Sequence, residues 1–487
     1  MKHVVFVMPP YPYSRSIGQE EGKRQIGLMP PLGVGYLTAY LERTGKYQCY
    51  FVDAVAERLS IEETVSRILS FEPDVIGISS FTTFLLNTSY QLARRLKEEC
   101  PSIPLLMGGP HTTSFGEQVL KDCPYIDYVI PGDAEVPLLE LLEKIFCGDI
   151  PDKVKGIIYK NEKDEIVDTG CSIPVDDIDT LPFPSRHIYN HELYEPLPSL
   201  SPKRPAMSMI TARGCPWARC KFCYQGGKYA SPFRRRSPEN VVAELKYLIE
   251  KYNVKNIVFW DDNFCIFPEW IHKFCSLIKQ GKIKLDWSVL SRVNTVTPEM
   301  LNEMAEVGCY SIQFGIESGN EEILKLIRKG HTLEQCRNAV RWAKSAGMET
   351  RAFFVLGFPT ETPAMSEETI RFACELNIDY VVFFSYYVAP GTLLAEIAMR
   401  EGQCFEFIGQ HLPSYLPNTY PDLETLTKKV QSAYRRYYLR PRYFARTITR
   451  TIRRPHHLKN QIKAFNYWLG LSLKKWTHNK NSTVNIT

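Results

Sequence analysis

The sequence contains no hydrophobic run that approaches the roughly 20 residues a bilayer-spanning helix requires. It also lacks the pattern of a secretory signal, because the first ten residues, MKHVVFVMPP, pass from a short apolar stretch directly into Pro-Pro. These two absences predict a cytoplasmic protein. In that compartment the 14 cysteines of the chain are expected to remain reduced thiols rather than to form disulfides.

Acidic residues are absent from the C-terminal end of the chain. Residues 428–487 contain 15 of the 59 Lys and Arg residues and no Asp or Glu, and aromatic side chains are interleaved with these bases. Such a surface can meet an anionic membrane, an acidic substrate or nucleic acid. The plainer alternative is an amphipathic helix that packs on the preceding barrel domain and exposes its basic side to water. We favour two roles for this surface: peripheral contact with a membrane, or a lid that covers the substrate. We expect no nucleic-acid partner. Residues 481–487 are expected to be disordered.

A chain of 487 residues, 44% of them hydrophobic, has room for roughly two to four domains. In residues 1–150 short apolar runs alternate with stretches of helical spacing. The alternation predicts a doubly wound, Rossmann-like α/β domain with a parallel sheet, whose ligands bind beyond the carboxyl ends of the strands. The expected strands span residues 2–8, 49–53, 75–80, 105–108 and 128–131.

Small and polar residues stand at the ends of three of these strands. They are Asp53, then Ser79, Ser80 and Thr82, then Gly108, Gly109 and His111. Hydroxyl groups can line a groove, and paired glycines let the backbone approach a ligand closely. Glycines at such turns are common, however, so a flavodoxin-like domain that binds no ligand is the alternative. His111 could face a ligand or cap a turn, and we favour the turn.

The remaining chain is expected to form a linker, a barrel and a helical end. Residues 151–200 carry the pattern of a β-hairpin followed by an acidic, proline-rich connector. In residues 201–400, six strand–helix steps predict a partial (β/α)6 TIM-like barrel with functional residues at the carboxyl ends of its strands. Residues 401–487 form the basic, aromatic-rich helical region. The candidates at the barrel's strand ends are Asp261, Asp262, Arg292, Glu317 and Ser318.

Three cysteines lie within nine residues directly after the first expected barrel strand. Cys215, Cys220 and Cys223 are separated by four and by two residues, and no fourth cysteine is near. Iron–sulfur clusters usually take four cysteinates, so an isolated trio suggests a [4Fe–4S] cluster with one iron open for chemistry. A Cys3His zinc site and ordinary buried cysteines are the alternatives.

The trio resembles that of the radical S-adenosylmethionine (SAM) superfamily, in which SAM chelates the open iron. The family's commonest spacing is C-x3-C-x2-C, and the one extra residue here costs little loop-closure entropy. Later segments resemble the family's D-D-x-F, G-I-E-S, G-x-P-x-E-T and P-G-T motifs in the same order. They begin at residues 261, 315, 357 and 390.

This resemblance implies how the candidates contact SAM. Asp261 and Asp262 would lie near the methionyl end of SAM, and Glu317, with Ser318 beside it, would accept the ribose hydroxyl protons. Arg292 could pair with the carboxylate of SAM, or it could be a surface arginine. The aromatic residues that flank the last cysteine, Phe222 and Tyr224, offer a ring that could pack on adenine.

The N-terminal domain resembles a cobalamin-binding domain, whose pattern is D-x-H-x-x-G, then S-x-L/T, then G-G. Residues 53–58 read DAVAER, so Val55 stands where the pattern has histidine. An aliphatic side chain cannot coordinate cobalt. We therefore expect cobalamin bound base-off, without a lower histidine ligand.

Together the two resemblances imply a cobalamin-dependent radical SAM enzyme. The commonest activity of that group is methylation of an unactivated carbon or phosphorus, here of a small-molecule, lipid or peptide-derived substrate held between the two domains. A flavodoxin- or ferredoxin-type reductase would supply electrons. One alternative is a non-methylating cyclase or rearrangement enzyme of tetrapyrrole or natural-product biosynthesis. Another is a non-catalytic corrinoid or zinc-binding sensor.

Overall fold

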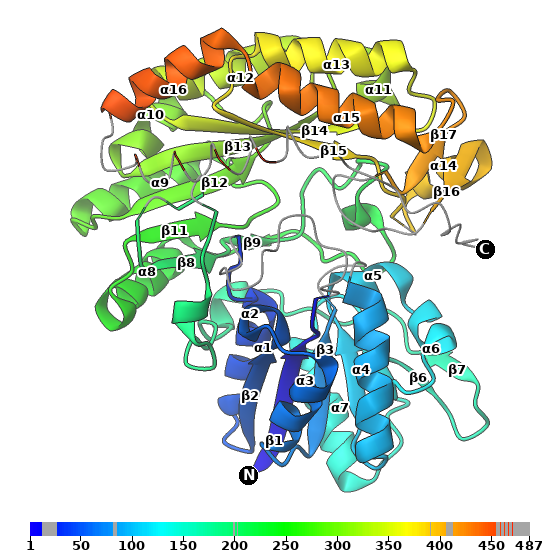
Figure 1. The fold of residues 1–487 in the computed structure, drawn as a ribbon. Coiled ribbons are helices and arrows are strands. Elements are labelled where there is room, and N and C mark those ends of the chain that lie inside the picture. The colour runs from blue at the N-terminus through cyan, green and yellow to red at the C-terminus, as the bar shows by residue number, and fades with distance from the viewer. Residues whose placement is uncertain are drawn as a thin grey trace. The chain divides into compact units, whose positions relative to one another are not determined.

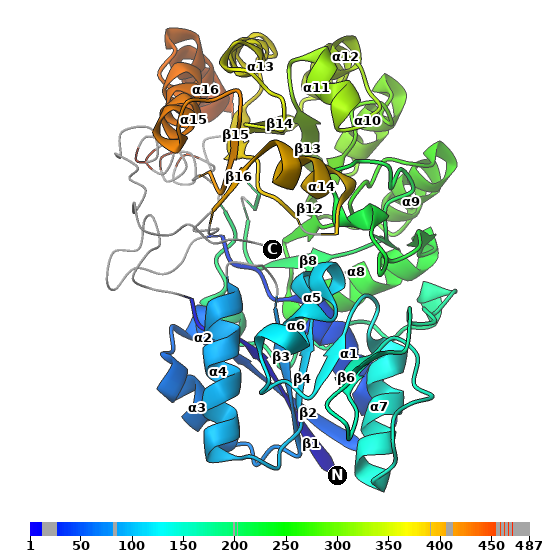
Figure 2. The same ribbon diagram turned by 90° about the vertical axis from the view of Figure 1, so that its right-hand side faces the viewer.

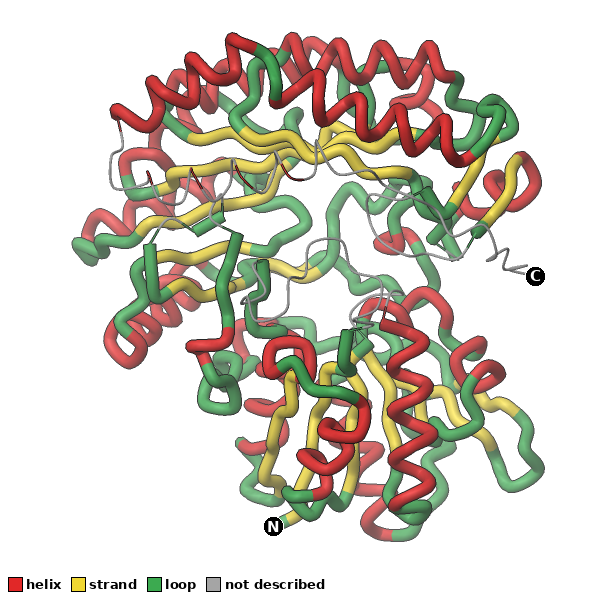
Figure 3. Tube along the Cα trace, in the orientation of Figure 1, coloured by secondary structure: helices red, strands yellow, loops and turns green. Residues whose placement is uncertain are grey.

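The computed structural model describes residues 1–11, 27–80, 85–197, 200–201, 203–389, 391–405 and 413–453, together with residues 458, 462, 466 and 470. The chain forms two compact units, each with its own sheet (Figures 1 and 3). Unit 1 comprises Met1–Glu195 and Tyr224–Arg234, and unit 2 comprises Pro196–Cys223 and Arg235–Thr487.

Unit 1 is built on a seven-stranded sheet in the order β2-β1-β3-β4-β5-β6-β7. The first five strands pair in parallel, and the hairpin β6–β7 adds two antiparallel strands at one edge. The parallel sheet confirms the predicted fold class. The hairpin expected within a linker is thus part of this sheet, because it continues the ladder beyond β5. The strands are β1 (Lys2–Met8), β2 (Tyr47–Asp53), β3 (Val75–Ser79), β4 (Leu105–Gly108), β5 (Tyr128–Ile130), β6 (Ile158–Lys160) and β7 (Ile166–Asp168).

Helices cover both faces of this sheet (Figure 2). Apolar side chains of α3 and α4 pack in one core with the strands, and those of α1 and α7 pack in a second core on the other face. Two buried faces explain why the strands read as continuous apolar runs. The helices are α1 (Leu32–Glu42), α2 (Ala54–Glu57), α3 (Ile61–Leu69), α4 (Leu86–Glu99), α5 (Pro110–Phe115), α6 (Gln118–Asp122) and α7 (Glu135–Cys147).

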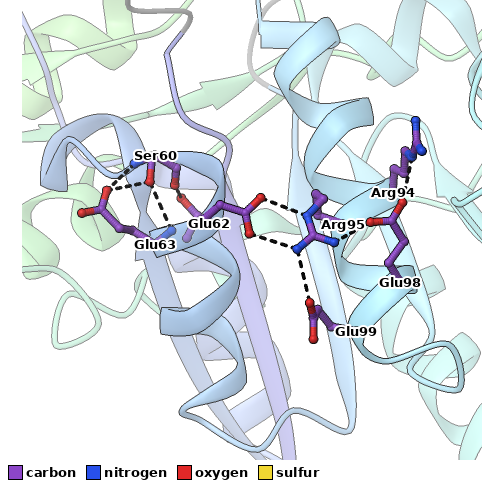
Figure 4. A network of polar contacts seen from close by, with 8 residues as sticks. Ser60, Glu62, Glu63, Arg94, Arg95, Glu98 and Glu99 are labelled. Carbon is purple, nitrogen blue, oxygen red and sulfur yellow. Dashed lines mark hydrogen bonds and ion pairs between the residues drawn. The ribbon is translucent and has the colours of Figure 1, made fainter.

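A network of charges joins α3 to α4 at the surface of unit 1 (Figure 4). Arg95 of α4 reaches Glu62 of α3 with two nitrogens, at 2.9 and 3.0 Å. At the start of α3, Ser60 and Glu63 form a capping box in which each side chain accepts a hydrogen bond from the other residue's N–H. Because these groups are exposed, the network aligns the two helices and adds little stability.

Unit 2 contains a six-stranded parallel sheet in the order β15-β14-β13-β12-β11-β8, with helices following the strands. This arrangement confirms the predicted partial barrel. Three of the helices begin with a Ser or Thr cap and a Pro, which needs no N–H partner at that position. The elements are β8 (Ala206–Met209), β9 (Ala212–Arg213), α8 (Pro238–Tyr252), β11 (Asn256–Phe259), α9 (Pro268–Gln280), β12 (Asp286–Ser291), α10 (Pro298–Glu306), β13 (Cys309–Glu317), α11 (Glu321–Leu326), α12 (Leu333–Ser345), β14 (Glu349–Leu356), α13 (Pro363–Glu375) and β15 (Tyr380–Ser385).

The helical region after the barrel covers the free edge of β15. The hydroxyl of Tyr434 accepts from the N–H of Phe383 at 3.0 Å and donates to its carbonyl at 2.9 Å. Tyr438 does the same at Val381, at 2.9 and 2.7 Å. These tyrosines therefore belong to the core of unit 2, where they replace a neighbouring strand. The elements of this region are α14 (Leu393–Glu401), β16 (Gly402–Cys404), β17 (Tyr415–Pro417), α15 (Leu423–Tyr438) and α16 (Pro441–Arg453).

Two expectations for the C-terminal region fall partly or wholly outside the described residues. Residues 481–487, which were predicted to be disordered, lie outside the described residues. Most of the aromatic and basic residues after 453 lie outside them as well. Among the helices that are described, none has both the length and the apolarity needed to cross a bilayer.

Candidate functional site

Asp261 fixes the path of the chain into the cysteine loop. It lies just after β11, is buried, and accepts hydrogen bonds from the N–H groups of Thr211 and Ala212 at 2.7 and 2.6 Å. The hydroxyl of Thr211 donates to its second oxygen at 3.1 Å. Burial raises the pKa of Asp261, and these hydrogen bonds oppose that effect. The carboxylate thus ties the segment between β8 and β9 to the end of β11.

Four consecutive backbone carbonyls accept hydrogen bonds from the cysteine loop and from the residues that follow β12. They belong to Ile327–Gly330, which follows α11 and which we call the clamp segment. Two of the donors lie in the cysteine loop and two follow β12. In order along the segment the donors are the N–H of Lys221 at 3.0 Å, Nε1 of Trp217 at 3.0 Å, Nη2 of Arg292, and Nδ2 of Asn294 at 3.1 Å.

Two cations lie beside the second cysteine of the trio. Nη1 of Arg292 is 3.9 Å from Sγ of Cys220. Lys329 of the clamp segment forms a buried ion pair with Glu317 at 2.9 Å. Burial raises the pKa of the Cys220 thiol, and the charges of Lys329 and Arg292 lower it. Cationic neighbours of this kind favour the thiolate, which is the form that binds metal.

The three cysteines of the trio lie in one loop, and their number suits a [4Fe–4S] cluster with one open iron. None of the three forms a disulfide, and all are partly buried. Within the described residues, no three His, Cys, Asp or Glu side chains gather closely enough to hold one metal ion. The cysteines of a cubane bind different irons, so they need a wider arrangement than the ligands of one zinc.

The other predicted residues of unit 2 have separate environments. The ring of Phe222 lies 5.9 Å from that of Phe358 and 5.8 Å from Nζ of Lys329, so it borders the charged cluster. The hydroxyl of Ser318 is hydrogen-bonded to the hydroxyl of Thr369 at 3.1 Å. It also accepts from the N–H of Asn320, just before α11, at 3.1 Å. Asp262 is exposed. Tyr224 is also exposed, and it belongs to the segment 224–234 of unit 1.

Several predicted residues meet at the carboxyl edge of the unit 1 sheet. The N–H of Ser80 donates to Gly108 at 2.8 Å, and the N–H of His111 donates to Ser80 at 3.3 Å. Gly109 has a φ of +108°, and a Cβ there would lie 2.8 Å from the carbonyl oxygen of Ser80. Ser80 Oγ is buried without a hydrogen-bond partner in the described part of the chain. An unsatisfied hydroxyl beside an obligatory glycine fits a site that a ligand completes.

Asp53 and Val55 begin the short helix α2. Asp53 caps it by accepting from the N–H of Ala56 at 2.9 Å, and it accepts from the hydroxyl of Tyr194 at 2.8 Å. Burial raises the pKa of Asp53. Val55 is buried against Met8 in an apolar cluster, so this position offers no metal ligand.

His111 lies in the first turn of α5, and Ser79 ends β3. The His111 ring stacks on Phe115 with centroids 4.1 Å apart, and burial lowers the pKa of its imidazole to about 4. The imidazole is therefore neutral at pH 7. Thr82, the last of the predicted hydroxyl residues, lies outside the described residues.

Sequence reasoning missed the residues that organise the cysteine loop. Lys329, Trp217 and Asn294 act through a long-range ion pair and through backbone carbonyls, which leave no local pattern. Glu361 was noted only as part of a motif, and it accepts the N–H groups of Gly357 and Phe358 at 2.9 Å each. The glycine of this turn, Gly357 with a φ of +83°, was the only local signal, because the burial of Glu361 is evident only in the structure.

Two family models match the chain. The radical SAM superfamily matches residues 209–373, and the B12 binding domain matches residues 26–142. The chain is 31% identical over 430 residues to the uncharacterized methyltransferase PH0819 of Pyrococcus horikoshii, covering 88% of this chain and 92% of that protein. It is 29% identical over 472 residues to the anaerobic magnesium-protoporphyrin IX monomethyl ester cyclase of Rubrivivax gelatinosus, covering 95% of this chain and 82% of that one.

A solved structure shares the fold. The radical SAM methyltransferase TsrM from Kitasatospora setae, with cobalamin and a [4Fe–4S] cluster bound, superimposes with a TM-score of 0.66 at 16% identity, over 82% of this chain and 75% of that one. The chain belongs to the radical SAM superfamily. Within it, this protein is an enzyme of the group that carries an N-terminal B12-binding domain. The cofactors expected from the sequence, a [4Fe–4S] cluster, SAM and cobalamin, are those of that group.

Proposed function

We propose that the protein is a cobalamin-dependent radical SAM methyltransferase that acts on an unactivated carbon or phosphorus of a small-molecule, lipid or peptide-derived substrate. The observation that carries the proposal is the match to a relative named a methyltransferase over 88% of the chain, including both the B12-binding and the radical SAM regions. The proposal is also supported by the cation-flanked cysteine trio, which suits the cluster, and by the unsatisfied Ser80 hydroxyl, which suits cobalamin.

The residues of the chain bind and orient the reacting groups. When bound, the cluster, SAM and cobalamin supply hydrogen abstraction and methyl transfer. Cys215, Cys220 and Cys223 would hold the cluster, in a loop that is hydrogen-bonded to Asp261 and to the clamp segment. Glu317 is held in place by Lys329 at the end of β13, where it can meet the ribose of SAM.

The proposal is tested with anaerobically purified, reconstituted protein. We expect about four iron atoms per chain, retained cobalamin, and cleavage of SAM to 5′-deoxyadenosine on reduction. Replacing any one cysteine of the trio by Ala should abolish cleavage and spare cobalamin binding. Stoichiometric zinc without iron would refute the enzyme and support the sensor alternative. With methyl-labelled SAM and an extract of a deletion strain, the product should carry the label.

A second candidate is a non-methylating cyclase or rearrangement enzyme. It is favoured by the match to the cyclase relative, which extends over 95% of the chain. The two candidates share their cofactor residues, so product mass separates them. A product that gains a labelled methyl group supports methylation, and one that loses hydrogen or gains oxygen without label supports the cyclase.

We infer a cytoplasmic enzyme that receives electrons from a flavodoxin- or ferredoxin-type reductase. The inference is supported by the 14 cysteines, none of which forms a disulfide, since a reducing compartment keeps thiols free. Reduction of the reconstituted protein by purified flavodoxin and its reductase, followed by its absorbance, tests the donor class.

We also propose that α16 makes peripheral contact with an anionic membrane. Tyr443 is buried, and Arg446 pairs with Asp379 at 3.6 Å, so this side of the helix is attached to unit 2. Phe444, Ile448 and Ile452, four residues apart, are 37, 61 and 74% exposed. A four-residue spacing places these three on one face of the helix. An exposed apolar stripe in a region without acidic residues suits a negatively charged bilayer.

Flotation of the full chain with vesicles tests the contact. We expect binding to phosphatidylcholine vesicles that contain phosphatidylglycerol, and at least about tenfold weaker binding of an Ile448→Gln/Ile452→Gln variant, because two apolar side chains no longer enter the bilayer. Ile173→Gln is the matched control, since Ile173 is 70% exposed in unit 1. Equal binding by the double variant, or a preference for RNA over vesicles, would contradict the proposal.

A further inference from the structure

Every nitrogen of the Arg292 guanidinium is engaged by its surroundings. Nε donates to Oδ1 of Asn294 at 3.3 Å, Nη2 donates to the carbonyl of Lys329, and Nη1 points to Sγ of Cys220 at 3.9 Å. The guanidinium carbon lies 4.7 Å from the centroid of the Trp217 ring. Because the side chain is also buried, its positive charge is fixed beside the sulfur.

The backbone that carries Arg292 is fixed as well. The side-chain oxygen of Asn263 accepts the N–H of Arg292 at 3.1 Å and the hydroxyl of Ser291 at 2.8 Å. Asn263 thus joins the end of β12 to the turn after β11. The arginine is therefore held from its backbone to its charged end, and a ligand that took its guanidinium would have to replace several of these contacts.

The two cations near Cys220 differ in how their charges are matched. Lys329 is paired with the carboxylate of Glu317 at 2.9 Å. The contacts of Arg292 are with an amide oxygen, a backbone carbonyl, an aromatic ring and the cysteine sulfur. A buried charge acts strongly because the surrounding protein screens it less than water does. Both cations add positive potential at the sulfur, and the carboxylate of Glu317 offsets part of that from Lys329.

Gly330 determines whether Trp217 can support this arrangement. Its φ is +74°, and a Cβ at this position would lie 2.1 Å from the Trp217 ring. Trp217 contacts both the clamp segment, through Nε1, and the face of the guanidinium. Any side chain at residue 330 must therefore displace the indole that holds Arg292.

We propose that Arg292 is a positioning residue that holds the cysteine loop and raises the reduction potential of the cluster bound there, with the clamp segment and Trp217 keeping it in place. This role replaces the contact with the SAM carboxylate that the family resemblance suggested, and it rests on the proposed [4Fe–4S] cluster. Reduction of the cluster by one electron from a flavodoxin- or ferredoxin-type donor would add one negative charge to it. A fixed cation beside a ligand sulfur stabilises that added charge.

The test is a redox titration of reconstituted protein followed by electron paramagnetic resonance, with SAM affinity measured separately by equilibrium dialysis. Arg292→Met should shift the midpoint potential to a more negative value and leave the Kd for SAM within about threefold, less than about 0.7 kcal/mol. Arg292→Lys keeps the charge and should shift the potential less. If Arg292→Met binds no iron while Arg292→Lys does, the positioning role is supported.

A glycine pair provides a matched control. Gly330→Ala should shift the potential in the same direction as Arg292→Met, because the displaced Trp217 releases the guanidinium. Gly347→Ala should behave as wild type: Gly347 has a similar φ of +78° and no atom within 4 Å of the added Cβ. An unchanged potential in Arg292→Met with SAM binding weakened tenfold or more would overturn the inference. Wild-type protein that binds no iron would instead refute the proposed function.

Discussion

Replacing Asp261 by Ala should disable the cysteine loop without touching a cysteine. The change leaves the buried N–H groups of Thr211 and Ala212 without their partner. Each unsatisfied buried N–H costs about 1–3 kcal/mol, so the local penalty is about 2–6 kcal/mol. Relief of the burial that raises the pKa of Asp261 offsets part of this penalty. We expect unit 2 to unfold at lower urea concentration and the variant to incorporate less iron.

Asp261→Asn separates hydrogen bonding from charge. One oxygen of Asp261 accepts both N–H groups, and the other accepts the hydroxyl of Thr211. An amide can keep the first pair with its oxygen, and its NH2 can donate to the hydroxyl instead. We therefore expect iron content near that of wild type and a stability change of at most about 1 kcal/mol.

Wild type, Asp261→Ala and Asp261→Asn are compared by iron content, SAM affinity and urea unfolding. These measurements separate an anchoring role of Asp261 from a direct contact with SAM. If Asp261→Ala binds iron and unfolds as wild type does, the anchoring role is wrong. If Asp261→Asn fails as severely as Asp261→Ala, the negative charge matters more than the hydrogen bonds. If Asp261→Asn keeps its iron but binds SAM at least tenfold more weakly, the carboxylate contacts SAM as the motif resemblance implied.

Three further outcomes are expected. Burial raises the pKa of Glu361 from 4.5 to about 7. Between these pH values the native state keeps a proton that the unfolded chain releases. The free energy of unfolding should therefore fall by about 3 kcal/mol in all as the pH rises from 4.5 to 7. Glu361→Gln should remove that slope in urea unfolding across this pH range, and a persisting slope would contradict the assignment. Tyr434→Phe and Tyr438→Phe should each cost about 1–3 kcal/mol, because backbone groups of β15 lose their partner; unfolding midpoints equal to wild type would argue against edge protection. Gly109→Ala should lose the absorbance of bound cobalamin. Gly170→Ala is the control and should retain it, because Gly170 also has a positive φ but has open space around it. Equal retention by both variants would contradict a close approach of the backbone to cobalamin at residue 109.

The parallel strands were the most predictable part of the fold. The expected strands 2–8 and 105–108 coincide with β1 and β4, because a strand buried on both faces is a continuous apolar run with polar neighbours. Helix starts were also readable: Ser237 and Pro238 begin α8 as a cap and a first-turn proline should. These features are local, so the sequence alone contains them.

Long-range partners were the least predictable part. The cysteine trio was evident, but the clamp segment was not, because any residue offers a backbone carbonyl. Arg292 was found from its place after a strand, whereas its contact with Cys220 depends on how the loops fold together. The tyrosines of α15 belong to the basic, aromatic-rich region, for which the sequence left open both a surface facing a membrane or substrate and an amphipathic helix packed on the barrel. They are buried because the edge of β15 needs hydrogen-bond partners.

The hydrogen bonds from the tyrosine hydroxyls of α15 to the backbone of β15 have a consequence for solubility. A bare edge strand presents alternating donors and acceptors to which another polypeptide can add as a new strand. At Val381 and Phe383 both groups are occupied by side chains of α15. A chain that stops before α15 would expose this template and should form intermolecular sheets, so the last helices protect the barrel from self-association.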